Sequence, residues 1–316
     1  MKRLICIFTA FAFLAGCTID YPIIYDPDLR LLFQPQMYMH ISLSEQVECF
    51  PEDQDIAVCA WTSEKEWLEL TRAYAQDVVI TDTIRKVQVT DRLWGFEEAV
   101  LWPKKNQVLS FTAYSPYEAD CKVNKNKGVQ WSTDNVLEDQ IDLLYSHMDM
   151  DRSHNVDGNV VQMCFNHAMC RVDFRVKNRV DNTGALDALN RPDKITVKKI
   201  TINGVKYKGS FASLPSAEWT LAEDKVALPI YEGLFLTSGV PEPIGTSWMM
   251  LPQKLETVVT VEFQYTTFAN TTITQVIKTV PMKTNLEPGR NYTYTLSVGI
   301  DDVKFLQELI EEDLVK

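Results

Sequence analysis

The sequence predicts an all-β protein made of two tandem antiparallel β-sandwiches with a few short helices. Three observations support this fold class: apolar and polar residues alternate over many short runs, helical patterns are few, and the strand–helix alternation of a parallel sheet is missing. A polar stretch at residues 147–158, rich in Asp and His, marks the expected boundary between the two sandwiches.

The alternating runs predict half-buried strands, because successive side chains of a strand point to opposite faces of its sheet. A hairpin is expected around Ala269 and Asn270, which separate two such runs. In chain order, the clearest runs cover residues 37–43, 109–114, 160–165, 205–211, 259–266 and 292–298. In the core of the second sandwich we expect Phe165, Val172, Phe174, Leu251, Tyr292 and Tyr294.

Three other segments have apolar residues at helical spacing. Ser63 to Glu66 has the form of a capping box, and the apolar residues that follow share one face up to Tyr74. Apolar stripes also run through residues 134–145 and 302–314. The sequence therefore predicts three helices, the last of them in the C-terminal tail.

The first seventeen residues have the pattern of a bacterial lipoprotein signal. Lys2 and Arg3 precede an apolar run, residues 4–14, that is too short for a membrane-spanning helix. The sequence Leu-Ala-Gly-Cys that ends at Cys17 then forms a lipobox. We expect cleavage before Cys17, acylation of its thiol, and anchorage of the exported chain to a membrane through this lipid.

The composition is that of a globular, acidic protein. The 316 residues are 46% hydrophobic and 23% charged, which excludes a disordered chain, and 31 Lys and Arg against 43 Asp and Glu give a net charge of −12. An acidic surface without a basic stripe repels phosphate backbones. A nucleic-acid partner is therefore not expected.

The cysteines do not form a complete disulfide framework. Five remain beyond the signal and Cys17, and an odd number cannot pair fully within one chain. These are Cys49, Cys59, Cys121, Cys164 and Cys170. We expect them to be small buried residues with free thiols.

No catalytic, metal or cofactor site is expected. The motifs HExxH, GxSxG and GxGxxG do not occur. Asp149, Asp151 and Ser153 match the first three ligand positions of an EF-hand loop, but His154 stands where that loop requires Gly. His167 has no nucleophile context and is expected to be a hydrogen-bonded structural residue. The sequence thus predicts that the protein is not an enzyme.

Seven tryptophans leave two interpretations open. Trp side chains anchor cores, and exposed Trp faces bind sugars by stacking. The seven are Trp61, Trp67, Trp94, Trp102, Trp131, Trp219 and Trp248. If they are exposed, the alternative function is a non-polymerising, glycan-binding surface lipoprotein.

Several segments, taken in order behind the lipobox, resemble the Bacteroidetes fimbrillin family of type V pilin-like lipoproteins. Residues 161–174 are similar to the family pattern V-x-L-x-F-x-H-x-x-A-x-V-x-F, with Cys170 in place of Ala, and residues 111–116 are similar to F-x-A-x-x-P. Further similar segments are residues 142–146, 200–205, 209–211, 250–253 and 286–294. The resemblance covers about residues 100 to 300.

The resemblance implies two transthyretin-like sandwiches, a location at the cell outer membrane with the chain at the cell surface, and a role in adhesion. In stalk members of that family, an Arg- or Lys-specific protease removes the first strand, and a C-terminal strand of the next subunit fills the groove. This is β-strand addition, in which an unpaired edge and an apolar slot are satisfied together. The implied partners are other fimbrial subunits, with host glycans or proteins as candidate ligands.

Both ends of this chain differ from the stalk pattern. Arg30 is the only basic residue between Cys17 and Lys65, so cleavage there leaves the first predicted strand in place. The predicted helix in the tail would not act as a donor strand. We therefore expect an accessory subunit, at the anchor or the tip, or a surface lipoprotein that never polymerises.

The expected organisation follows from these boundaries. A lipoprotein signal covers residues 1–16, a lipid-anchored segment 17–36, the two sandwiches 37–156 and 157–300, and the tail 301–316. Within the first sandwich, the triplet Asp82-Thr83-Ile84 resembles an O-glycosylation site of Bacteroidetes exported proteins, with Thr83 as the acceptor.

Overall fold

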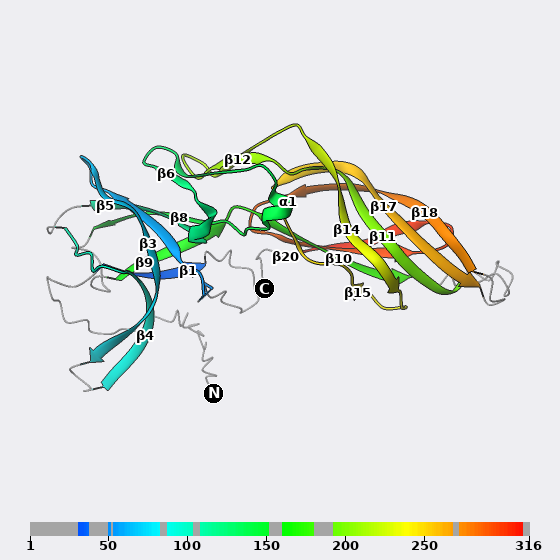
Figure 1. Cartoon of the computed structure of the whole chain (residues 1–316), viewed down its shortest axis with the longest axis horizontal. Helices are drawn as coiled ribbons and strands as arrows, with labels where there is room; N and C mark the ends of the chain where they lie inside the picture. Colours follow the sequence, from blue (N-terminus) through cyan, green and yellow to red (C-terminus); the bar gives the residue numbers. More distant parts are fainter. Residues whose placement is uncertain are drawn as a thin grey trace, which may run out of the picture.

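The computed structural model consists almost entirely of β-strands, which confirms the predicted all-β class. It describes residues 31–37, 50–51, 53–82, 87–103, 108–151, 160–179, 192–267 and 272–311. Two halves follow one another along the long axis of the molecule, and a small sheet lies across their junction (Figure 1).

The first half is a closed barrel. Strand β1 joins the two ends of the strand path, because it pairs antiparallel with β4 and parallel with β9. The strands are β1 (Leu32–Met37), β4 (Val87–Phe96), β3 (Glu66–Asp82), β2 (Ile56–Trp61), β5 (Val108–Ser115), β8 (Leu144–Asp151) and β9 (Val160–His167), in barrel order. Large apolar side chains fill the interior, among them Phe33, Trp94, Phe111 and Phe165.

The second half is a sandwich of two sheets. The first has the order β14 (Lys225–Leu236), β11 (Pro192–Lys206), β17 (Gln253–Thr267) and β18 (Thr272–Leu286). The second has the order β15 (Glu242–Pro243), β10 (Cys170–Asn178), β19 (Asn291–Val298) and β20 (Val303–Glu311), with β16 (Trp248–Met250) also on β10. The buried faces of both sheets share one apolar core.

A third, small sheet connects the halves. Strand β7 (Gly128–Thr133) from the first half pairs with β12 (Gly209–Ala212) from the second, and β6 (Lys122–Asn124) and β13 (Glu218–Leu221) flank them. A 3₁₀ turn, η1 (Tyr117–Ala119), and one helical turn, α1 (Val136–Asp139), lie nearby in the chain. A separate buried cluster, which includes Tyr114, Trp131, Leu143, Met169, Phe211 and Leu251, fills the junction.

All six predicted core residues are buried, but they belong to three clusters. Val172, Phe174, Tyr292 and Tyr294 lie in the core of the second half, as predicted. Phe165 lies in the barrel core and Leu251 in the junction cluster. The Tyr292 hydroxyl donates to the Asn285 carbonyl at 2.9 Å and accepts the Glu287 N–H at 2.8 Å, so the polar end of this buried ring is satisfied.

The helix predicted after Ser63 is wrong. The segment forms the turn of the β2–β3 hairpin, and residues from Glu66 onward belong to β3. Thr62 closes the turn, because its N–H donates to the Lys65 carbonyl at 2.8 Å and its hydroxyl accepts the Lys65 N–H at 3.2 Å. Ser, Thr and charged residues suit both a helix start and a hairpin turn, and strand pairing decides between them.

The helix predicted for the C-terminal tail is also wrong. The tail forms β20, which pairs antiparallel with β19 from Val298 opposite Val303 to Asn291 opposite Glu311. A bulge places one extra residue in β20, since Phe305 faces Leu296 and Glu308 faces Tyr294. Leu306, an apolar residue of the predicted helical stripe, is exposed in this strand, so the apolar spacing of the tail does not mark a buried helix face.

Three other predictions have different outcomes. The hairpin around Ala269 is confirmed, because β17 and β18 pair antiparallel up to Thr266 and Thr272. Of residues 134–145, only α1 is helical. The run at 37–43 lies almost wholly outside the described residues, which place the first strand at β1.

The boundary predicted after residue 156 falls one strand too early. Strand β9 follows it in the chain but pairs with β1 and β8 in the barrel. The chain enters the second half between β9 and β10. The second half also extends past residue 300, because β20 is its edge strand.

Candidate functional site

The predicted site residues Cys17, Arg30 and Thr83 lie outside the described residues. Their neighbours in the chain are described: β1 begins shortly after Arg30, and Thr83 falls between the end of β3 at Asp82 and the start of β4 at Val87. The described features that bear on function are strand β1, the C-terminal strand β20 and the junction of the two halves.

Strand β1 occupies an apolar slot in the barrel wall. It makes six register pairs with β9, from Leu32 opposite Val160 to Met37 opposite Phe165. Its burial alternates, and Phe33, Pro35 and Met37 are the inward residues. The Phe33 ring meets the rings of two barrel phenylalanines edge to face, with centroids 5.5 and 6.0 Å apart. The chain thus fills this slot with its own first described strand.

The C-terminal strand lies at an open edge. Among the described strands, β20 pairs only with β19, so its outer backbone groups face away from the sheet. Asp302, just before β20, pairs with Arg179 after β10 and with Lys304, the latter at 2.8 Å. These hydrogen bonds, chiefly the one from Lys304, hold the pKa of Asp302 below its ordinary value.

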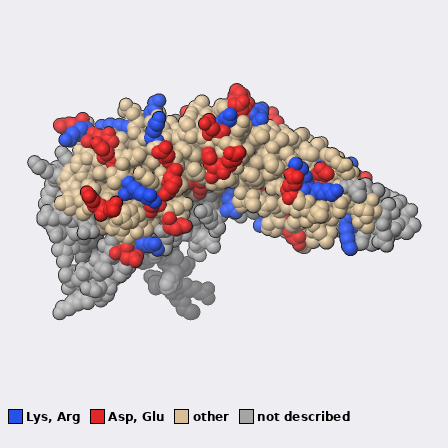
Figure 2. Space-filling model, viewed as in Figure 1, with Lys and Arg blue, Asp and Glu red and all other residues tan. Residues whose placement is uncertain are grey.

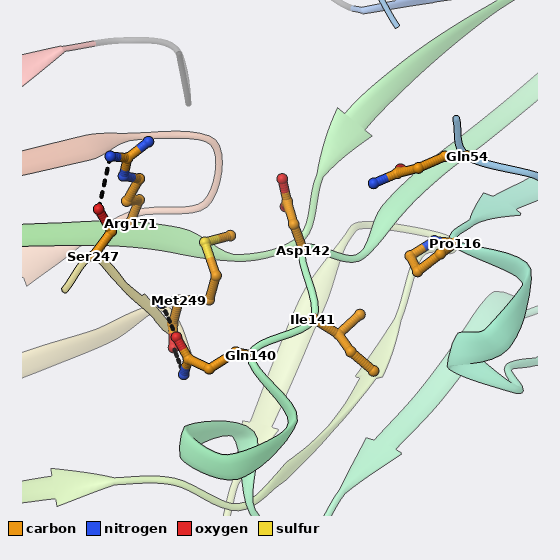
Figure 3. Close-up of a pocket in the computed structure, with 8 residues that line it drawn as sticks. All are labelled: Gln54, Pro116, Gln140, Ile141, Asp142, Arg171, Ser247 and Met249. Carbon is orange, nitrogen blue, oxygen red and sulfur yellow. Dashed lines mark hydrogen bonds between the residues drawn. The ribbon is translucent and has the colours of Figure 1, made fainter. Parts of the chain in front are cut away.

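A crevice of about 600 Å³ lies between the two halves, and we call it the junction crevice. Its lining comes from separate parts of the chain: the segments before β2 and after β5, the link from α1 to β8, strand β10, and β16 with the residue preceding it. The lining residues are Gln54, Pro116, Gln140, Ile141, Asp142, Arg171, Ser247 and Met249 (Figure 3).

Gln140 fixes the link from α1 against β16. Its side-chain NH₂ donates to the Met249 carbonyl at 3.2 Å and to the Val136 carbonyl at 3.1 Å, and its side-chain oxygen accepts the Met249 N–H at 3.0 Å. Its φ is 47°, a left-handed conformation that non-glycine residues seldom adopt. These hydrogen bonds stabilise the conformation and hold one wall of the crevice in place.

The crevice carries one charge of each sign, and each is held by a partner. The Arg171 guanidinium donates to the Ser247 hydroxyl at 2.7 Å and pairs with Asp173 at 3.1 Å. Asp142 Oδ1 lies 2.9 Å from His167 Nδ1. His167 is thus hydrogen-bonded, as predicted. Three lining residues, Pro116, Asp142 and Arg171, fall in segments that the family resemblance covers, but the resemblance does not indicate that they share a crevice.

The tryptophans do not form a sugar-stacking platform. All seven are described, and none is exposed. Four are buried, and Trp219 and Trp94 use their indole N–H groups inside the protein, on the carbonyls of Ala168 at 2.7 Å and Gln54 at 2.8 Å. The interpretation of exposed Trp faces as a glycan site is therefore wrong.

The polar residues of the EF-hand-like stretch that the structure describes are strand residues of β8. His147 Nδ1 lies 3.0 Å from the Thr112 hydroxyl, and Asp149 accepts from the Ser110 hydroxyl at 2.6 Å, across the β5–β8 pairing. In the part of the chain that the structure describes, no three His, Cys, Asp or Glu side chains gather as a metal site requires.

Four cysteines are described, and none of these four is in a disulfide. Cys59, Cys121 and Cys170 are buried, as expected, and burial raises the pKa of each thiol well above its ordinary value. Cys164 is exposed on β9, contrary to expectation.

The visible surface mixes charges of both signs. Lys and Arg lie among Asp and Glu over both halves on the face shown, without a basic stripe there (Figure 2). Within the described ranges, no helix is both long and apolar enough to cross a bilayer.

The chain is similar in sequence to one protein family and in fold to several solved structures. The sequence matches the fimbrillin-like family over residues 46–311. Among curated proteins, none matches it. Two similar crystal structures are those of candidate cell adhesion proteins. The one from Bacteroides uniformis has a TM-score of 0.52 and 11% identity over 90% of this chain and 99% of that one. The one from Bacteroides ovatus has a TM-score of 0.50 and 15% identity over 92% and 99%. At these identities the likeness shows a shared fold.

Proposed function

The chain belongs to the fimbrillin-like family, and we propose that it is an accessory fimbrial subunit, placed at the anchor or the tip and not repeated along the stalk. As a member of a family of fimbrial structural proteins, it is not an enzyme. The proposed partners are other fimbrial subunits, and the proposed contact with them is β-strand addition.

The proposal of an accessory subunit rests mainly on one observation, that β1 closes the barrel. No Lys or Arg occurs between Arg30 and Lys65. A cut at Arg30 leaves β1 attached, and Lys65 lies in the turn after β2. A cut there would detach β2 together with β1, and β2 is paired on both sides, with β3 and β5. A protease specific for basic residues therefore has no position from which to free β1 alone.

An attached β1 also excludes a donor strand by mass action. An intramolecular strand has a high effective concentration, so a partner's strand must compete against it for the same slot. The partner would have to replace six backbone register pairs and the buried Phe33, Pro35 and Met37. The C-terminal segment does not distinguish an accessory subunit from a stalk subunit. It forms strand β20 and not the predicted helix, so it no longer argues against a donor strand.

The proposal can be tested with the purified protein lacking residues 1–17. We expect it to remain a monomer after treatment with an Arg-specific protease, because no such cut removes β1 alone. Size-exclusion chromatography and denaturing gels without heating would follow its size. Formation of heat-stable ladders from the wild-type sequence would identify a stalk subunit and overturn the accessory position.

We further propose that the chain is held at the outer membrane by lipid on Cys17. The lipobox supports this. In cells fed a tagged palmitate, the wild type is expected to incorporate label and the Cys17→Ala variant to lose it, since the thiol is the acceptor. Equal labelling of both would remove the anchor from the proposal but leave the accessory position intact.

A further inference from the structure

The junction crevice has the size and lining of a small-molecule site. Its volume of about 600 Å³ falls within the ~300–1,000 Å³ typical of such sites, which often lie between domains. Ile141, Met249 and Pro116 supply apolar surface. Figure 3 shows Asp142 between Arg171 on one side and Gln54 on the other, so three polar side chains surround that apolar surface.

The lining is fixed before any ligand arrives. Gln140 is bonded to both backbone groups of Met249, Arg171 to Ser247, and Asp142 to His167. Gln54 Oε1 accepts from the Ser115 hydroxyl at 3.2 Å, which orients its amide. Rigid polar groups lose little conformational entropy on binding.

Two hydrogen-bonding atoms of this lining carry no partner within the described residues. One is the side-chain NH₂ of Gln54, a donor, and the other is the second carboxylate oxygen of Asp142, an acceptor. Asp142 is only 20% exposed, so its unused oxygen has limited access to bulk water. Hydroxyl groups of a ligand can serve each of these atoms, because a hydroxyl both donates and accepts.

The charged groups of the crevice favour a neutral ligand. Neither needs a charged partner from the ligand, because Arg171 is paired with Asp173 and Asp142 is bonded to His167. A neutral ring with several hydroxyl groups and an apolar C–H face satisfies both the polar groups and the apolar lining. We propose that the junction crevice binds a neutral saccharide of one or two rings. None of the described residues that line the crevice is aromatic, so binding is expected to be weak, with Kd on the order of 1 mM.

Saccharide binding in the crevice would be a second property of the protein, and it does not depend on the proposed role in fimbriae. The test uses the unlipidated protein and free saccharides, namely glucose, galactose, mannose, fucose, N-acetylglucosamine and lactose, each at about 10 mM. Saturation-transfer NMR would detect binding, and titration would give Kd. At least one saccharide is expected to bind, and Gln54→Ala and Asp142→Asn are each expected to weaken it about tenfold, the loss of one hydrogen bond to a ligand.

The variants are chosen so that folding does not confuse the result. Gln54→Ala keeps the backbone carbonyl that accepts from Trp94, so this variant is expected to fold. Ser210 is exposed on β12 and lines a separate hollow, so Ser210→Ala is the matched control and should bind like the wild type. The proposal is overturned if no saccharide in the panel binds, if both crevice variants bind at full strength, or if Ser210→Ala abolishes binding.

Discussion

Replacing Phe33 with Ala is expected to lower the free energy of unfolding by about 3–5 kcal/mol. Phe33 is fully buried, and its ring packs edge to face against Phe96 and Phe111. Truncation removes the apolar contacts of the ring and leaves a cavity that the surrounding barrel cannot fully close. Urea denaturation of the unlipidated protein, followed by tryptophan fluorescence, would measure the change.

A matched control lies on the same strand. Gln36 faces outward on β1, so Gln36→Ala removes a side chain without opening the core. Its effect is expected to stay within about 0.5 kcal/mol. If the two variants were equally stable, β1 would not hold the slot as described, and the proposed accessory position would lose its physical basis.

The sequence predicted best those strands in which apolar and polar residues alternate regularly. In β5, Leu109, Phe111 and Ala113 are fully buried, and β9 and β19 likewise coincide with alternating runs. Local pattern suffices there because the period of two follows from strand geometry alone. It failed in β20, where apolar residues at helical spacing predicted a helix but the segment pairs with β19 as a strand.

Long-range pairings carried no local signal. The parallel pairing of β1 with β9 closes the barrel, and the pairing of β7 with β12 joins the halves, yet each connects strands far apart in the sequence. The boundary was misplaced for this reason, since β9 is tied to the first half through β1. The junction crevice was also out of reach, because its lining comes from separate segments of both halves.

The two ends of the chain contribute differently to assembly. Strand β1 is paired on both sides and buried on one face, whereas β20 is an edge strand that pairs only with β19 among the described strands. Each strand makes seven register pairs, but β1 must leave from between two partners and take its buried face out of the core, whereas β20 lies at an open edge. If strand addition is possible for this fold, the limiting step is the release of β1, and a new cleavage site after β1 should remove that limit.

We therefore expect the Glu45→Arg variant to form multimers after digestion with an Arg-specific protease. A cut at position 45 separates β1 from the rest of the chain, so β1 no longer has the effective concentration of an attached strand. Once diluted, the fragment leaves, and the opened slot can take β20 of another copy. Glu45→Lys introduces the same charge without the cleavage site and should stay monomeric, as should the digested wild type. Size-exclusion chromatography would separate these outcomes, and a cut Glu45→Arg protein that lost its fragment yet remained a stable monomer would refute strand addition at this slot.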